Sequence, residues 1–142
     1  MKPPKQIVLF IDRALGKKII ADRLRAEGAR VEIHDDHFSQ DCVDEEWLTE
    51  VGSRGWVVLT KDKHFQRREL EIRAITNANV RVFQLTAGNI QGIEMAEVFS
   101  KALTKIRRIA ASNRPPFIAK ITRTGVVQLV YSRRKLKRRY TP

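Results

Sequence analysis

Short apolar segments that alternate with longer amphipathic ones are the feature of this sequence that most constrains its fold. Residues 6–11 (Gln-Ile-Val-Leu-Phe-Ile) and 56–60 (Trp-Val-Val-Leu-Thr) are nearly continuous apolar runs, as strands buried on both faces of a parallel sheet require. Between such runs, apolar residues recur at helical spacing. This alternation predicts the α/β class, with a mostly parallel central sheet covered by helices on both faces. We predict strands at 6–11, 30–34, 56–60 and 81–85, and helices at 15–27, 44–53, 66–77 and 91–111.

The chain changes character after Pro115-Pro116. Two short strand-like segments on either side of Thr124-Gly125 predict an antiparallel β-hairpin within residues 117–131. A length of 142 residues suits one domain, which we expect to span residues 1–131. Residues 132–142 carry six Lys and Arg side chains, and we expect them to form a basic tail that cannot fold by itself.

The charge of the chain points to a polyanionic partner. Lys and Arg number 28 against 16 Asp and Glu, which gives a formal net charge of +12. A protein this basic gains affinity for phosphate backbones by releasing their condensed counterions, so we expect it to bind nucleic acid. A membrane surface is a poorer fit, because no basic amphipathic segment carries the aromatic face that interfacial binding uses.

The sequence also favours the cytoplasm as the location of the protein. No apolar run approaches the roughly 18 residues of a membrane span, and the first residues do not resemble a signal peptide. Cys42 is the only cysteine, which excludes a disulfide within the chain and a zinc site built from cysteines.

Three aspartates occupy corresponding positions in the predicted sheet. Asp12 follows the first strand, Asp62 follows the third, and Asp44 begins the helix that leads into the third. Because ligands of open parallel sheets bind beyond the carboxyl ends of the strands, we expect these carboxylates to meet at one edge. Glu45, Asp35 and Asp36 belong to the same edge.

A cluster of carboxylates indicates a bound cation. Neighbouring like charges repel one another, and a divalent metal such as Mg²⁺ or Mn²⁺ removes that cost. At a phosphodiester, such a metal can generate a hydroxide nucleophile and stabilise the departing oxygen. The simpler alternative is that each aspartate caps the helix that follows it.

Three segments together resemble PIN-like domains. They are Ile11-Asp12-Arg13-Ala14-Leu15-Gly16, then Asp44-Glu45-Glu46-Trp47-Leu48, then the strand that ends in Thr60-Lys61-Asp62-Lys63-His64-Phe65. The resemblance is strongest to compact PIN-like proteins related to toxin ribonucleases of the VapC type, and it covers roughly residues 6–110. It implies a three-layer α/β/α PIN-like fold, to which the hairpin and the basic tail are additions.

The resemblance also implies an activity. In such proteins, acidic residues at these positions bind Mg²⁺ or Mn²⁺ and cut single-stranded RNA, which assigns metal binding and catalysis to Asp12, Asp44 and Asp62. Glu45 would assist or replace Asp44, and Thr60 would orient Asp62 through its hydroxyl. Larger PIN domains have a further acidic residue ahead of the Thr-x-Asp strand, and here Asp36 is the candidate replacement.

Basic side chains near the predicted site are candidates for contact with substrate phosphates. They either grip RNA or form a solvated charged face, and the tail is an RNA-binding arm, a segment that docks into an acidic partner, or a disordered end. The candidate RNA-binding residues are Arg13, Lys61, Arg67, Arg68, Arg133 and Arg134.

The sequence therefore supports two functional hypotheses. The first is a metal-dependent endoribonuclease that is the toxin of a toxin-antitoxin pair, and the resemblance then implies a cognate protein antitoxin. The second is a non-catalytic PIN-like protein that binds nucleic acid or acts as a scaffold. A homodimer is compatible with either hypothesis.

Overall fold

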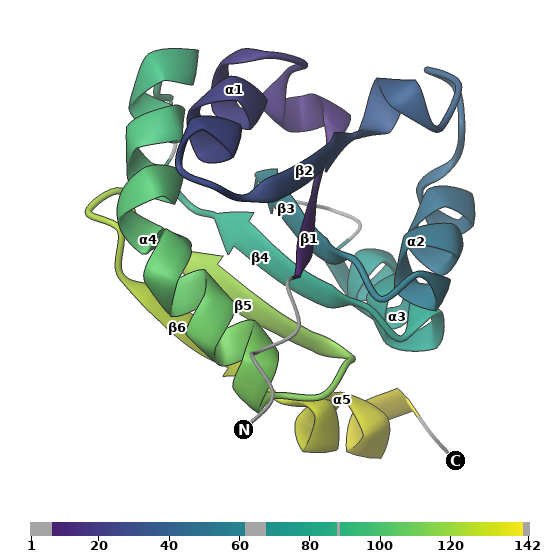
Figure 1. Ribbon diagram of the computed structural model, residues 1–142. Coiled ribbons are helices and arrows are strands. Elements are labelled where there is room, and N and C mark those ends of the chain that lie inside the picture. The colour runs from purple at the N-terminus through teal and green to yellow at the C-terminus, as the bar shows by residue number, and fades with distance from the viewer. Residues whose placement is uncertain (1–6, 62–67, 88, 141–142) are drawn as a thin grey trace, which may run out of the picture.

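The computed structural model describes residues 7–61, 68–87 and 89–140, and these contain one six-stranded sheet with the strand order β2-β1-β3-β4-β5-β6. The first five strands are parallel to their neighbours, and β6 pairs antiparallel with β5 to form the predicted hairpin (Figure 1). The strands are β1 (Val8–Ile11), β2 (Arg30–Ile33), β3 (Val57–Lys61), β4 (Arg81–Leu85), β5 (Phe117–Ile121) and β6 (Val127–Tyr131).

Helices cover both faces of this sheet. The elements α1 and α4 pack on one face, and α2, α3 and α5 pack on the other (Figure 1). The predicted three-layer α/β/α arrangement is therefore confirmed. The helices are α1 (Ile19–Ala26), α2 (Asp44–Ser53), α3 (Arg68–Ala78), α4 (Gly92–Ser112) and α5 (Arg133–Tyr140), with short 3₁₀ turns η1 (Arg13–Leu15) and η2 (His34–Asp36).

Alternating side chains of each strand divide the core into two layers. Leu9 and Ile11 of β1 face α1 and α4, while Phe10 faces α2 and α3. All three side chains are at most 1% exposed. Burial on both faces is the reason that the strands appear in the sequence as continuous apolar runs.

The segment predicted as one helix over residues 15–27 is divided in two. Gly16 has a φ of +85°, a left-handed conformation that interrupts a helix, so that η1 ends at Leu15 and α1 begins at Ile19. This break places the polar segment that follows Asp12 at the carboxyl edge of the sheet.

The C-terminal segment differs from the expected tail, because residues 133–140 form the helix α5. Leu136 is fully buried in the layer with α2 and α3. At the end of the helix, Arg139 and Tyr140 each bond to the Glu69 carboxylate at 2.7 Å. Six cations on eight residues disfavour an isolated helix through mutual repulsion, and these tertiary contacts offset that cost. None of the helices in the described ranges is long and apolar enough to cross a membrane.

Candidate functional site

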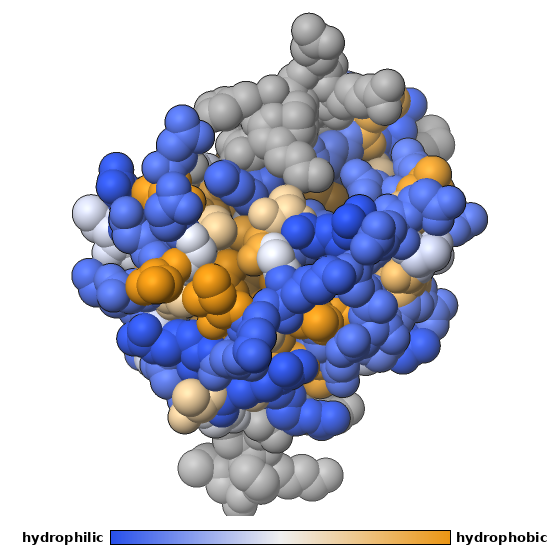
Figure 2. Space-filling view, turned by 90° about the horizontal axis from the view of Figure 1, so that it is seen from above, coloured by the Kyte–Doolittle hydropathy of each residue, from blue (hydrophilic) through white to orange (hydrophobic). Residues whose placement is uncertain are grey.

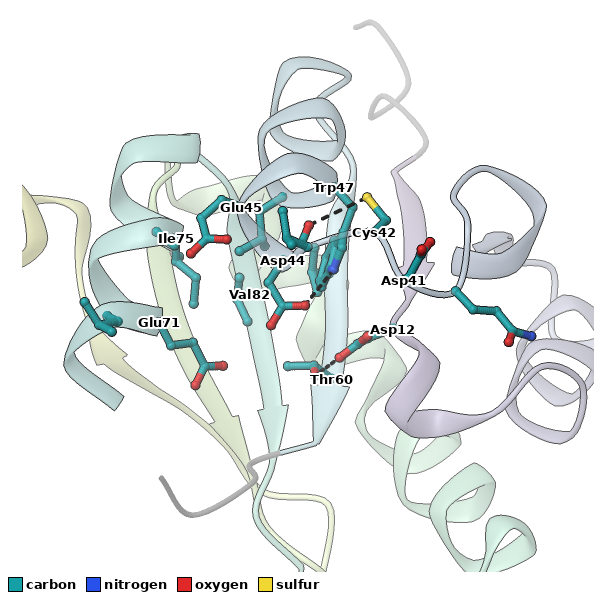
Figure 3. A pocket seen from close by; sticks show the side chains of 16 residues that line it. Asp12, Asp41, Cys42, Asp44, Glu45, Trp47, Thr60, Glu71, Ile75 and Val82 are labelled. Atoms are coloured by element: carbon teal, nitrogen blue, oxygen red, sulfur yellow. Dashed lines mark hydrogen bonds between the residues drawn. The ribbon is translucent and has the colours of Figure 1, made fainter. Parts of the chain in front are cut away.

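A cavity of about 470 Å³ opens between α2 and α3 on their face of the sheet, near the carboxyl ends of β1 and β3. Its walls also include residues 40–43, which lead into α2 (Figure 3). Seen from the side where β1 and β3 end, the surface is mostly hydrophilic and has apolar side chains gathered near its centre (Figure 2). This is the edge at which a parallel sheet presents its ligand site.

Asp12 lies at the base of the cavity directly after β1. The residue is 7% exposed, and its carboxylate accepts a hydrogen bond of 2.6 Å from the Thr60 hydroxyl of β3. Its backbone N–H donates to the Leu59 carbonyl, which extends the pairing of β1 with β3. Although Asp12 precedes η1, its side chain makes no capping hydrogen bond there. The helix-cap alternative does not apply to this residue.

Asp44 is the first residue of α2, and its carboxylate also has a partner other than the helix backbone. The indole Nε1 of Trp47 donates to Asp44 Oδ1 at 2.9 Å. Trp47 is held in turn by packing on Phe10, with ring centroids 5.4 Å apart. The N-cap position belongs to Val43, so that Asp44 does not cap α2 with its side chain. Glu45, the next residue, lines the cavity as well.

Glu71 is a cavity residue that the sequence analysis missed. It lies in the first turns of α3, and its carboxylate points into the cavity from the side opposite Asp12 (Figure 3). Gln84 Nε2 of β4 lies 3.4 Å from Glu71 Oε1. The available signal was its position four residues before the buried Ile75, which places it on the inner face of the helix.

The described part of the cavity wall is acidic. Five carboxylates and no Lys, Arg or His are among the described residues that line it, in a protein of net charge +12. Within the same described ranges, no three His, Cys, Asp or Glu side chains form a group that could hold a metal ion. The five are Asp12, Asp41, Asp44, Glu45 and Glu71.

Cys42 also lines the cavity but is not suited to act as a nucleophile. Burial raises the pKa of its thiol, and the neighbouring Glu46 carboxylate raises it further. The sulfur lies 3.4 Å from Glu46 Oε2, to which it donates. A protonated thiol is a weak nucleophile, so Cys42 is a poor candidate for nucleophilic catalysis.

Thr60 and Asp36 have surroundings that the sequence did not predict. The Thr60 hydroxyl donates to Asp12, where we expected it to orient Asp62. Asp36 is exposed in η2 and is not among the residues that line the cavity. Asp62 itself lies outside the described residues.

Arg13, Lys61, Arg133 and Arg134, which we predicted to bind RNA, are not among the residues that line the cavity. Arg13 is engaged by the Asp35 carboxylate at 3.2 Å and donates to the Gln40 carbonyl, so it joins the loops after β1 and β2. Lys17 also bonds to Asp35 and, together with His34 and Arg13, holds the pKa of that carboxyl below its usual range.

The other candidates for RNA binding lie elsewhere in the fold. Lys61 is half-buried at the end of β3 and does not line the cavity. Arg133 donates to the Pro115 carbonyl at the start of α5, and Arg134 is exposed on the same helix. Arg68 begins α3, and Arg67 lies outside the described residues.

Comparison with known proteins agrees with this architecture. A curated protein of Mycobacterium tuberculosis, named "Putative ribonuclease VapC45", is 25% identical over 139 residues, which cover 92% of this chain and all of that protein. No solved structure matches the chain. The family model described as a PIN like domain matches residues 7–87, which include the strands β1 to β4 and the cavity between α2 and α3. The chain belongs to the family of PIN-like domain proteins.

Proposed function

We propose that this protein is a metal-dependent endoribonuclease and the toxin of a toxin-antitoxin pair. The observation that carries the proposal is the acidic cavity itself, whose described lining includes five carboxylates while the molecule as a whole is strongly cationic. A cation in the cavity would reconcile the acidic wall with a polyanionic substrate. The likeness to a protein named as a ribonuclease over almost the whole chain supports the same activity.

The chemistry of the donors suits a hard divalent cation. Every ionisable oxygen donor among the described lining residues is a carboxylate, which is the ligand type that Mg²⁺ and Mn²⁺ prefer. We assign metal binding to Asp12, Asp44 and Asp62, and we add Glu71 as the further acidic residue that the family resemblance required. When bound, the metal would supply a hydroxide nucleophile and stabilise the leaving oxygen.

Neutral donors contact three of the described carboxylates. Thr60 donates to Asp12, Trp47 donates to Asp44, and the Gln84 amide approaches Glu71. A hydroxyl, an indole and an amide orient a carboxylate without cancelling its charge, as partners of metal ligands must. A lysine or arginine at any of these positions would weaken cation binding.

Cleavage of RNA by the purified protein tests the proposal. We expect cleavage that requires Mg²⁺ or Mn²⁺ and that stops when a chelator is added. Asp12→Asn and Asp44→Asn should abolish it, because each removes a charged ligand. Asp36→Asn is the matched control, since it removes an exposed carboxylate outside the cavity and should leave the rate unchanged. Equal rates for Asp12→Asn and the parent protein would disprove the proposed site.

The toxin role has a separate test in cells. Expression of the parent chain should arrest growth, and the Asp12→Asn variant should not. A cognate antitoxin that blocks the acidic cavity with an Arg or Lys side chain would restore growth, and both proteins would act in the cytoplasm. Equal growth with the parent and the variant would count against a toxin. The nuclease activity would then be judged from the cleavage assay only.

The second candidate function is a PIN-like protein that binds nucleic acid without cutting it. It is favoured by the finding that the described carboxylates do not approach one another closely enough to form a metal-ligand group. Binding would then fall with salt and be unaffected by chelator. Chelator-resistant binding together with the absence of cleavage would establish this alternative.

A further inference from the structure

A row of polar side chains crosses the sheet from the acidic cavity toward β6. Thr60 of β3 is paired in register with Gln84 of β4, and Gln84 with Lys120 of β5. On the same face, two residues earlier in each strand, the corresponding row is Val58, Val82 and Ile118, at most 2% exposed. The sheet face thus changes from apolar to polar between two successive rows.

A second cavity, of about 250 Å³, opens over the far part of this row. Glu71 lines both cavities, so they adjoin on the two sides of that residue. Lys120 and Tyr131 form part of the wall on the far side. The acidic cavity therefore adjoins the second cavity, whose lining includes a lysine.

Positive charge replaces negative charge beyond Glu71. The Lys120 side chain is half-buried and, among the described residues, has no hydrogen-bonding or ion-pairing partner. Lys135 of α5 lies with its Nζ 5.0 Å from the ring centre of Tyr131. A half-buried lysine side chain keeps its stem against the cavity wall while its ammonium group stays free to bind an anion such as a phosphate.

We propose that this second cavity binds a backbone phosphate of the RNA strand, one or more nucleotides away from the phosphate that is cut, with Lys120 as its principal contact. The strand would leave the acidic cavity past Glu71 and Gln84 and cross the sheet along the polar row, and Lys135 would add charge at the far end. The inference rests on the proposed function only in taking RNA as the polyanion.

The role of Lys120 predicts a particular salt dependence. Each phosphate neutralised on a single strand contributes about 0.7 to the slope of log K against log salt. Lys120→Gln should lower that slope by about this amount and weaken binding several-fold, for any sequence. A dinucleotide, which fills only the acidic cavity, should bind equally to the variant and the parent.

The experiment measures fluorescence anisotropy of labelled single-stranded RNA over a series of salt concentrations, with chelator present to prevent cleavage. Lys105→Gln is the matched control, because Lys105 is an exposed lysine of α4 on the opposite side of the sheet. Lys120→Arg should restore the parental slope, and circular dichroism shows whether each variant is folded. In cleavage assays with Mg²⁺, Lys120→Gln should raise KM and leave kcat unchanged.

The outcomes separate this inference from the proposed activity. A smaller slope for Lys120→Gln than for Lys105→Gln supports the phosphate site, even if the protein never cuts RNA. Identical slopes for the two variants overturn it, even if cleavage is robust. A loss of poly-glutamate binding without a loss of RNA binding also overturns it and assigns Lys120 to an acidic protein partner.

Discussion

The hydrogen bond from Thr60 to Asp12 gives the sharpest test of how the site is built. Both residues are buried, at 6% and 7% exposure, and the two oxygens lie 2.6 Å apart. Thr60→Val preserves the branched shape and removes the hydroxyl. A hydrogen bond to a charged group contributes about 1.5–3 kcal/mol to stability. Thr60→Val should therefore lower the free energy of unfolding by roughly 2 kcal/mol. With an m-value of about 2 kcal/mol/M, the urea midpoint should fall by about 1 M.

A second buried threonine provides the control. Thr76 is 4% exposed and donates to the Ile72 carbonyl within α3, so Thr76→Val removes a bond between neutral groups. That bond contributes about 0.5–1.5 kcal/mol, less than a bond to a carboxylate. Thr60→Ser keeps the hydroxyl and should stay close to the parent. If urea unfolding with chelator present shows that Thr60→Val costs no more than Thr76→Val, Thr60 does not stabilise a charged Asp12.

Three further perturbations probe the proposed metal site, the helix packing and the C-terminal helix. Mg²⁺ or Mn²⁺ should raise the melting temperature of the parent protein by several degrees but not that of Asp12→Asn, and an equal rise in both would contradict the assigned ligand. Gly52→Ala should destabilise the fold by about 1–3 kcal/mol in urea unfolding, because its Cβ would lie 2.1 Å from the Ala78 carbonyl oxygen; an unchanged midpoint would refute that close packing. The Tyr140 hydroxyl and then Arg139 lower the pKa of Glu69, so this stabilisation is present above the ordinary value of 4.5 and is lost as pH falls through the lower folded value. Amide exchange in α5 should therefore accelerate in acid, and pH-independent exchange would show that Glu69 does not anchor the helix.

The sequence was sufficient to predict those helices and strands whose ends are set by residues within the element itself. The helix α2 has the predicted bounds because three acidic residues occupy its first turn, and the strand β4 spans the predicted residues 81–85. Asp12 and Asp44 line the cavity as the topology indicated, because residues at strand ends and in the following helix meet at one edge.

The features that the sequence did not reveal depend on contacts between distant segments. The helix α5 is stabilised by Leu136 in the core and by Glu69, which lies 70 positions from Arg139. Glu71 reaches the cavity only because α3 packs back over β3 and β4. Thr60 donates to Asp12, which lies 48 positions away in the sequence. The sequence pattern had instead suggested Asp62, two residues away, as the partner of Thr60.

Under the proposed function, the acidic wall would make the cation and the RNA each other's effectors. Without a cation, the carboxylates around Asp12 would repel a phosphate, and without a phosphate, the cation would bind only protein oxygens and water. By reciprocity, each ligand must raise the equilibrium affinity of the other by the same factor. A metal titration of the free protein would therefore understate the affinity of the complex with RNA, and the concentration of free Mg²⁺ would set how tightly RNA is held before any bond is cut.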